Sequence, residues 1–276
     1  MTSLERAERP AVWAEPIAPI RFVLDAWTIA EGELRKLRHD PTELLTRAVQ
    51  PLLWLLVFGQ VMAKARAIPT PGNIGYIDFL APGILAQSAL FSAIFFGIAV
   101  IWERDLGVLH KYLVSPASRG ALVTGKALAG GLRSLVQATM VYLLALVMGV
   151  HLRLDPVSIV AVAAVVVMGS AAFATFSLVI ACLVRTRERF MGIGQILTMP
   201  LFFASSAVYP LSIMPDWLKV MAQVNPLTYQ VDALRSLMLQ SGTPTVSSIG
   251  LDFGVLTFTT VVLIVIAAQL YPRLAQ

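Results

Sequence analysis

The stretch VSIVAVAAVVVMGSAAFATFSLVIACLV, residues Val157–Val184, decides the fold of this chain because it contains no charged side chain. A helix needs about 20 consecutive apolar residues to cross the hydrocarbon core of a bilayer. Five further stretches are also long and mainly apolar: Leu44–Met62, Phe79–Ile101, Leu122–Val150, Phe190–Tyr209 and Ile249–Leu270. The sequence therefore predicts an all-α polytopic membrane protein with six transmembrane helices.

The composition agrees with a chain that lies mostly in lipid. It has 276 residues, of which 57% are hydrophobic and 13% charged, whereas soluble domains are about 25% charged. The six stretches leave no room for a separate catalytic module. We expect two parts, a cytoplasmic arm with an amphipathic helix over residues 1–43 and a six-helix transmembrane domain over residues 44–276. The first stretch begins too late for a cleaved signal peptide, so we expect it to be retained.

The basic residues predict the orientation in the membrane. Of the 21 Lys and Arg residues, 16 lie before or at the start of the first stretch, between Trp102 and Arg133, in the loop after the fourth stretch and behind the last, while 5 lie in the alternate loops. Cytoplasmic loops carry the excess of Lys and Arg. Both termini are therefore expected in the cytoplasm. The net charge of +5 is read as a sign of topology, and no nucleic-acid partner is expected.

Ile20–Leu37, before the first stretch, has the pattern of an amphipathic helix. Ile20, Val23, Leu24, Trp27, Ala30, Leu34 and Leu37 recur at spacings of three and four. The segment is too polar to span a bilayer, so we expect it to lie along the inner membrane surface. Packing on a cytosolic partner is compatible with the same pattern.

The loop after the second stretch, Trp102–Pro116, predicts a short cytoplasmic helix. Leu106, Leu109 and Leu113 form an apolar stripe at helical spacing, and Pro116 marks the end. The third stretch follows, and Lys126 near its start is expected at the cytoplasmic end with its stem snorkelling along the helix.

Small residues fill the fourth stretch, which permits close approach of helices in lipid. We expect this helix inside the bundle or at a subunit contact, with close packing inside one chain as the simpler alternative. Pro51 predicts a kink or an interrupted turn in the first stretch.

The outer segment Tyr209–Leu239 is apolar, yet it is broken by Pro215 and Asn225-Pro226. Each piece is too short to span. Non-helical backbone is tolerated at membrane depth where it is buried in protein. We therefore expect two half-helices that dip back into the outer leaflet.

Several kinds of chemistry are missing from the sequence. It has no G-x-x-x-x-G-K-[ST] motif for ATP. The three histidines, His39, His110 and His151, are scattered over both sides, and Cys182 stands alone, so we expect no metal site, no disulfide and no enzymatic activity. Proton relays need ionisable groups inside the spans, and the six stretches contain almost none. Any transport energy must then come from another chain.

The tail Pro210…Met214-Pro215-Asp216-Trp217-Leu218…Asn225-Pro226-Leu227-Thr228-Tyr229…Asp232-Ala233-Leu234-Arg235 resembles the permease subunits of ABC type-2 exporters. The amphipathic helix, the six stretches and the cytoplasmic helix after the second are part of the same resemblance. It is similar to the membrane subunits of daunorubicin-resistance and nodulation-factor exporters. Ser205-Ser206 stands where that family commonly has Ser-Gly, which is a small departure.

The resemblance implies a half-transporter in a bacterial plasma membrane. Two permeases, identical or different, would pair above two ATP-binding-cassette ATPase subunits that hold ATP and magnesium, so this chain would need no cofactor of its own. Its coupling helix maps onto about Glu103–Ser115 and its connecting helix onto Ile20–Leu37. Glu103, Arg104 and Asp105 would make charged contacts with the ATPase, while Leu106 and Leu109 would pack into its cleft.

The resemblance also implies an outward path for an amphipathic or lipid-like compound, with drug efflux and antibiotic resistance as the associated roles. Aromatic and flexible side chains that could meet such a cargo are Phe91, Phe95, Phe96, Met199, Phe202 and Phe203. The outer half-helices would form a lid, with Trp217, Asn225, Pro226, Tyr229, Asp232 and Arg235 as its marked residues. Asp232 and Arg235 could pair with each other or contact substrate.

Other functions remain open at this level. The cargo could be a glycolipid or a lipid-linked polysaccharide, although an aromatic content of 9% favours a small or lipid-like cargo. The chain could also be a membrane scaffold or immunity protein that transports nothing. An intramembrane enzyme would need a buried nucleophile and base, and no such pair stands out.

Overall fold

The computed structural model describes residues 18–37, 49–66, 68–71, 74–108, 117–184, 186–240 and 247–271. These residues are helical apart from turns, loops and one isolated antiparallel bridge between Leu152 and Leu239. The helices in chain order are α1 Ala18–Leu37, η1 Trp54–Gly59, α3 Gln60–Ala65, α4 Tyr76–Asp105, α6 Arg119–Val147, α7 Pro156–Leu183, α8 Arg187–Phe203, η3 Leu211–Ile213, α9 Asp216–Val224, α10 Pro226–Met238 and α11 Ile249–Leu270.

Four helices among the described residues are long and apolar enough to cross a membrane: α4, α6, α7 and α11. The first predicted span coincides with a shorter apolar helix, Val49–Ala65. The fifth overlaps α8, which has 17 residues and does not count among the apolar helices of that length. The all-helical membrane fold is confirmed, and the number of six spans stays a prediction.

Pro51 does not end the first of these helices. The backbone stays helical through Pro51 and then forms the π-helical turn η1 directly afterwards. Proline has no backbone N–H and therefore removes one hydrogen bond from an α-helix. A π turn, with its wider i→i+5 hydrogen bonds, accommodates that loss within the helix. The predicted irregularity is thus present as a π turn rather than as a break in the helix.

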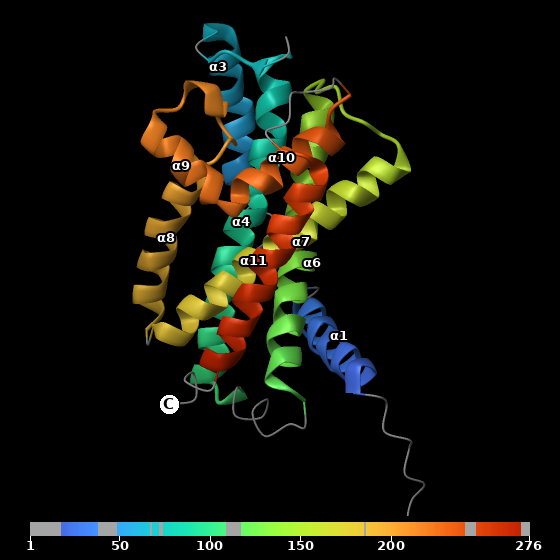
Figure 1. The fold of residues 1–276 in the computed structure, drawn as a ribbon, viewed down its shortest axis with the longest axis vertical. Coiled ribbons are helices and arrows are strands. Elements are labelled where there is room, and N and C mark those ends of the chain that lie inside the picture. The colour runs from blue at the N-terminus through green and yellow to red at the C-terminus, as the bar shows by residue number, and fades with distance from the viewer. Residues whose placement is uncertain are drawn as a thin grey trace, which may run out of the picture.

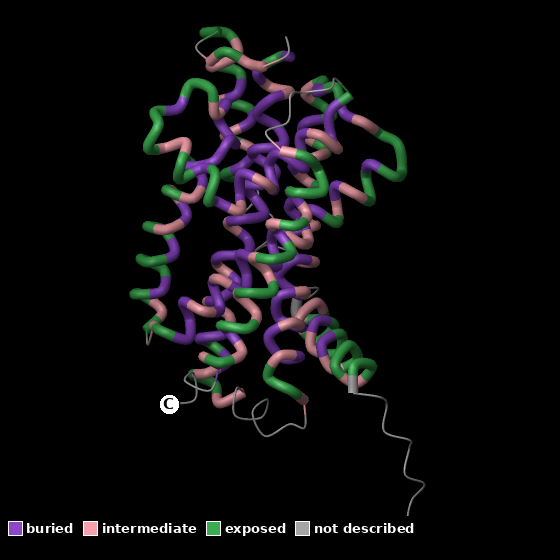
Figure 2. Tube along the Cα trace, viewed as in Figure 1, coloured by how far each residue is buried: buried purple, intermediate pink, exposed green. Residues whose placement is uncertain are grey.

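The centre of the bundle is α7, which packs against α4, α6, α10 and α11. Its small residues make this possible. A Cβ atom on Gly169 would lie 2.2 Å from the Gln230 side chain of α10, and one on Gly131 of α6 would lie 2.6 Å from the carbonyl oxygen of Val167. Figure 2 shows the buried residues gathered along the inside of the bundle. Close packing within one chain therefore accounts for the small residues of the fourth span.

The helix α1 lies against α6 with its small residues. Ala26 and Ala30 are buried, and a Cβ atom on Gly125 would lie 2.6 Å from the carbonyl oxygen of Ala26. The face that points away is apolar and exposed, with Ile20, Val23, Leu24 and Trp27. An exposed apolar stripe of this kind is what a helix lying on a membrane surface needs, while contact with the membrane itself stays a prediction.

The two ends of the bundle carry different structures (Figure 1). At one end lie α1 and the last turn of α11. At the other lie α3 and the short helices α9 and α10, which meet at Asn225-Pro226 as predicted. We call the α1 end, which the basic loops predict to be cytoplasmic, the inner end and the opposite one the outer end.

Candidate functional site

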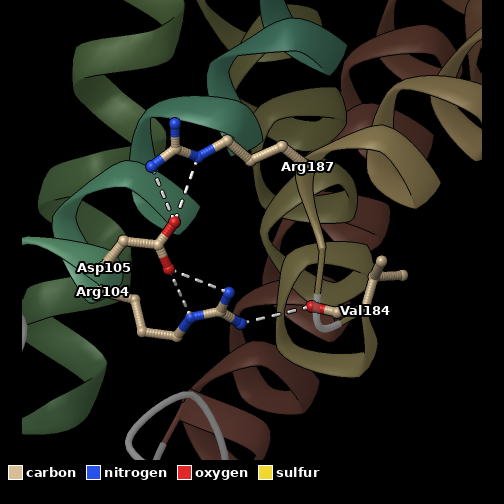
Figure 3. Close-up of polar contacts among 4 residues, drawn as sticks. All are labelled: Arg104, Asp105, Val184 and Arg187. Atoms are coloured by element: carbon tan, nitrogen blue, oxygen red, sulfur yellow. Dashed lines mark hydrogen bonds and ion pairs between the residues drawn. The ribbon is translucent and has the colours of Figure 1, made fainter.

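The inner end of α4 is joined to the start of α8 by a cluster of charges (Figure 3). The Asp105 carboxylate accepts hydrogen bonds from Nε and Nη2 of Arg187, at 3.1 and 2.7 Å. Its other oxygen accepts from Nε and Nη2 of Arg104, at 3.3 and 3.1 Å. The guanidinium of Arg187 also stands 4.0 Å from the centre of the Trp102 ring. We call Trp102, Arg104, Asp105 and Arg187 the α4–α8 clamp.

The clamp adds polar contacts to helix ends that a buried apolar cluster of Ile101, Ile180 and Phe190 also joins. The Nη1 atom of Arg104 lies 3.5 Å from the carbonyl oxygen of Val184, at the end of α7. Asp105 therefore holds α4 and α8 together, and Arg104 reaches α7. The sequence predicts ATPase contacts for Arg104 and Asp105. In the structure both are engaged within the chain, and any contact with a partner remains a prediction.

Leu106 is an exposed apolar residue at this end, with 72% of its surface accessible. The helix α4 ends at Asp105, and Gly107 takes a φ of +71°, which suits glycine at a helix terminus. Glu103–Asp105 are thus the last turn of α4 and not the start of a separate helix, because the helical ladder runs on unbroken from the apolar span. Leu109 and the rest of the predicted coupling helix lie outside the described residues.

Behind the clamp lies a buried ionic cluster that we call the inner triad: Lys126, Glu103 and Glu33. The ammonium of Lys126 donates to Glu103 at 2.5 Å and to Glu33 at 3.3 Å. Lys126 is 1% exposed and Glu103 6% exposed. The triad joins α6, α4 and α1.

The triad corrects one expectation. Lys126 does not snorkel toward water, because its charge is neutralised by carboxylates on neighbouring helices. The Glu103 carboxylate accepts from Lys126 within the chain, and its contact with an ATPase stays a prediction. The sequence contained a signal for this pairing, because Lys126 lies inside the third predicted span. Ionisable side chains within a span usually pair with an opposite charge. Glu103 stands just past the end of the second span, at the matching depth.

The predicted pathway residues do not gather in one cavity. Phe91 and Phe95 form a ring pair on α4, with centroids 6.4 Å apart. Phe202 and Phe203 lie at the outer end of α8, where both rings approach Trp54 of η1. Phe96 is buried, and its ring would stand 3.7 Å from a Cβ atom on Gly130. Met199 of α8 is half-buried. Contact with cargo stays a prediction for all of them.

In the outer lid, the name we keep for α9 and α10 although their role as a lid stays a prediction, Asn225 is the connecting residue. Its Oδ1 accepts from the amide of Leu227 and so caps α10, while its Nδ2 donates to the carbonyl oxygens of Leu201 and Ala204 at 2.7 and 2.8 Å. Pro226 is the first residue of α10, where a missing amide costs nothing. The lid is thus attached to the end of α8 through one amide side chain.

Two further lid residues lie toward the surface. The hydroxyl of Tyr229 donates to the carbonyl oxygen of Gln223, which ties α10 to α9. Trp217 of α9 is 67% exposed, and Val220, Met221 and Val224 expose the same apolar side of that helix. An apolar face of this kind suits contact with lipid.

Asp232 and Arg235 do not form the local ion pair that their spacing permits. Arg235 donates to the carbonyl oxygens of Phe79 and Ser206 and stacks on the Phe79 ring at 3.9 Å. Asp232 accepts from the amide and the hydroxyl of Ser247, at 2.8 and 3.2 Å. Both side chains are buried, so they join α10 to its neighbours and do not face open solvent.

Sequence reasoning missed the other polar residues around α10. Ser247 also bonds to Asp252 of α11, and Gln230 lies fully buried against α7. Asp252 at the start of the last apolar stretch was the available signal, because a carboxylate at a span end needs polar neighbours.

The described helices define the class of this molecule, a multi-pass membrane protein. The profile of the family described as "ABC-2 type transporter" matches residues 25–239, and the chain belongs to that family. It is 29% identical to the "Putative transport permease ycf38" of Cyanophora paradoxa over 225 aligned residues. The aligned part makes up 80% of this chain and 76% of the relative.

Two further relatives have more specific names. The chain is 24% identical to the "Daunorubicin resistance ABC transporter permease protein DrrB1" of Streptomyces coeruleorubidus, over 86% of this chain and 80% of the relative. It is 25% identical to "Nodulation protein J" of Rhizobium meliloti (strain 1021), over 83% of this chain and 86% of the relative. The resemblance found in the sequence is thereby confirmed.

Proposed function

We propose that this chain is the permease half of an exporter that moves an amphipathic, drug-like or lipid-like molecule outward across a bacterial plasma membrane. A separate ATPase subunit binds ATP and magnesium and supplies the energy. Two permeases, identical or not, form the transmembrane unit. Family membership and the relatives that are named as permeases support this function.

The observation that best supports the proposal is the arrangement of side chains at the inner end of α4. An exposed leucine there follows directly on a charge cluster that fixes α4 to α8. An apolar residue presented to water on a braced helix end suits insertion into a partner's cleft. A push on Leu106 would be transmitted along α4, a helix that reaches the lid through Phe79 and Arg235.

The relatives' names bear on the cargo. One is named for daunorubicin resistance, which favours a planar amphipathic drug as the first cargo to test. A glycolipid or lipid-linked polysaccharide is the alternative. The few charged residues within the spans favour cargo that enters laterally from the inner leaflet over a strongly hydrated solute.

Transport in proteoliposomes tests the proposal. The chain is reconstituted with its ATPase, and ATP-dependent movement of daunorubicin and of a fluorescent glycolipid is measured. We expect movement of the drug that is lost in Leu106→Asp. Leu154→Asp is the matched control, because Leu154 is an exposed leucine at the outer end and should keep activity. If neither cargo moves while the ATPase stays bound and active, the exporter function is wrong.

A further inference from the structure

A lateral pocket opens between the outer halves of α6 and α7, and nothing above assigns it a role. Its volume is about 140 Å³. The walls come from Leu135, Ala138 and Leu143 of α6 and from Ile159 and Ala163 of α7, and Leu85 of α4 forms part of its lining. Leu143 and Ile159 are exposed, so the pocket opens on the side of the bundle that lipid would cover.

The shape of the pocket follows from how the two helices cross. At Gly131 the backbones of α6 and α7 come so close that a Cβ atom would lie 2.6 Å from the carbonyl oxygen of Val167. Beyond that contact, larger residues line both helices and leave the pocket between them. The Gly131–Val167 contact lies nearer the inner end than any of the lining residues. The result is a wedge that opens toward the outer end.

Polar groups of Tyr142 and Arg153 lie at the outer end of this wedge. Tyr142 lines the pocket, and its hydroxyl donates to the carbonyl oxygen of Arg153 at 2.8 Å. The amide of Arg153 donates to the carbonyl oxygen of Met238 at 2.8 Å. Two hydrogen bonds therefore hold the Arg153 backbone beside the outer end of an apolar wedge.

The guanidinium of Arg153 makes no hydrogen bond and no ion pair among the residues that the structure describes. The neighbouring carboxylate of Asp155 caps α7 instead, accepting from the amide of Ser158 at 2.9 Å. That hydrogen bond holds the pKa of Asp155 below its usual range. Arg153 thus keeps its donors for a ligand. Nearby, the backbone amide and the ring Nδ1 of His151 both bond to the Asp78 carboxylate.

We propose that this wedge is a binding site for one phospholipid of the outer leaflet, with an acyl chain between α6 and α7 and the phosphodiester on Arg153. The apolar wedge suits the acyl chain of a phospholipid, and the Arg153 guanidinium suits its phosphate. Apolar cavities of this size stay dry and take apolar groups. Guanidinium groups pair with phosphate through charge-assisted hydrogen bonds. The site lies away from the inner end of α4, so it does not depend on the coupling role of Leu106.

The test uses the full chain with its bound ATPase in proteoliposomes that contain phosphatidylglycerol with a diazirine on its acyl chain. After photolysis, labelled peptides are mapped by mass spectrometry. We expect labelling of the α6 segment around Leu143. Diacylglycerol carrying the same diazirine has no phosphate and should label it less, by roughly tenfold, the factor expected for one charge-assisted hydrogen bond.

Two substitutions separate the two halves of the site. Ala163→Phe fills the wedge and should abolish labelling by both probes, whereas Ala164→Phe, on the exposed side of the same helix, should not. Arg153→Gln should lower phosphatidylglycerol labelling to the level of diacylglycerol and leave the fold intact. Equal labelling in Ala163→Phe and Ala164→Phe would overturn the proposal. So would displacement of the label by transported cargo at concentrations where unlabelled phosphatidylglycerol has no effect, because the wedge would then be a cargo site.

Discussion

The ammonium nitrogen of Lys126 lies 2.5 Å from the carboxylate of Glu103, and both side chains are buried between α1, α4 and α6. Glu103 stands two residues before Asp105 of the clamp and three before the exposed Leu106. The buried pair therefore fixes the base of the segment that we propose to contact the ATPase. Its surroundings are apolar and helical, so it has consequences for both stability and coupling.

Loss of Lys126 should destabilise the protein strongly. Lys126→Met leaves Glu103 and Glu33 buried side by side, and removal of one partner of a buried ion pair costs about 3–5 kcal/mol. Thermal unfolding in detergent measures the effect. Arg35→Met is the matched control on α1, because the pair of Arg35 with Glu31 is exposed and such pairs contribute about 0.3–0.5 kcal/mol. Equal shifts for both variants would show that the triad is not buried as described.

A charge exchange tests the pairing itself. Glu103→Lys and Lys126→Glu should each fail to yield folded protein, since each places like charges together. The double variant restores one attractive pair and should recover part of the folded yield. A double variant no better than either single one would mean that Glu103 and Lys126 do not interact directly.

The clamp should affect coupling more than stability. Its side chains are partly exposed, and exposed ion pairs contribute about 0–1 kcal/mol. Asp105→Asn should leave the unfolding temperature nearly unchanged but lower cargo-stimulated ATPase activity several-fold, because the last turn of α4 loses its ion pair with Arg187 of α8. Asp216→Asn removes an exposed pair with Lys219 on the outer side and serves as the control. Full stimulation in Asp105→Asn would exclude a role for the clamp.

A methyl group at Gly169 should disturb the centre of the bundle. The added Cβ would clash with the end of the Gln230 side chain, which is fully buried and has little room to move, and overpacking of this kind costs about 1–3 kcal/mol. Gly169→Ala should lower the unfolding temperature, and Gln230→Ala in the same chain should restore it. Gly192→Ala on α8, where nothing lies within 4 Å, should be neutral or stabilising by about 0.5–1 kcal/mol. If Gln230→Ala does not restore the unfolding temperature of Gly169→Ala, then the added methyl group clashes with a residue other than Gln230.

Asn225 should prove more than a helix cap. Asn225→Asp keeps the oxygen that accepts from Leu227 but loses both donors to the α8 carbonyls. It should therefore destabilise the outer lid as much as Asn225→Ala does, or more, because a carboxylate would face two carbonyl oxygens. Loss of a cap alone costs about 0.5–2 kcal/mol. Hydrogen exchange of the α10 amides measures the effect. An exchange rate in Asn225→Asp equal to that of the wild type would show that Asn225 only caps α10.

The general fold could be predicted because lipid imposes simple rules. Apolar length predicts the long helices, and proline and asparagine predict the break at Asn225-Pro226. The Lys126–Glu103 pair was not predicted, since the two residues lie on different helices and only their depth relates them. The same holds for Arg235, whose spacing from Asp232 suggests a local pair while the actual partners are carbonyl oxygens at Phe79 and Ser206.

Helix ends were predicted less well than helix centres. The sequence places a separate amphipathic helix from Glu103 onward, yet α4 continues to Asp105. Charged residues at the end of an apolar span extend the helix when a neighbour neutralises them, as Lys126 and Arg187 do here. Those neighbours come from α6 and α8, so a local pattern could not reveal them.

The most direct test of the central claim is to purify this chain from its native membrane in mild detergent and identify what accompanies it. The account predicts a stoichiometric ATPase with a P-loop, whose activity rises with an amphipathic cargo and whose association or stimulation is lost in Leu106→Asp but kept in Leu154→Asp. Recovery of the chain without an ATPase across several detergents, or an ATPase indifferent to Leu106→Asp, would contradict it.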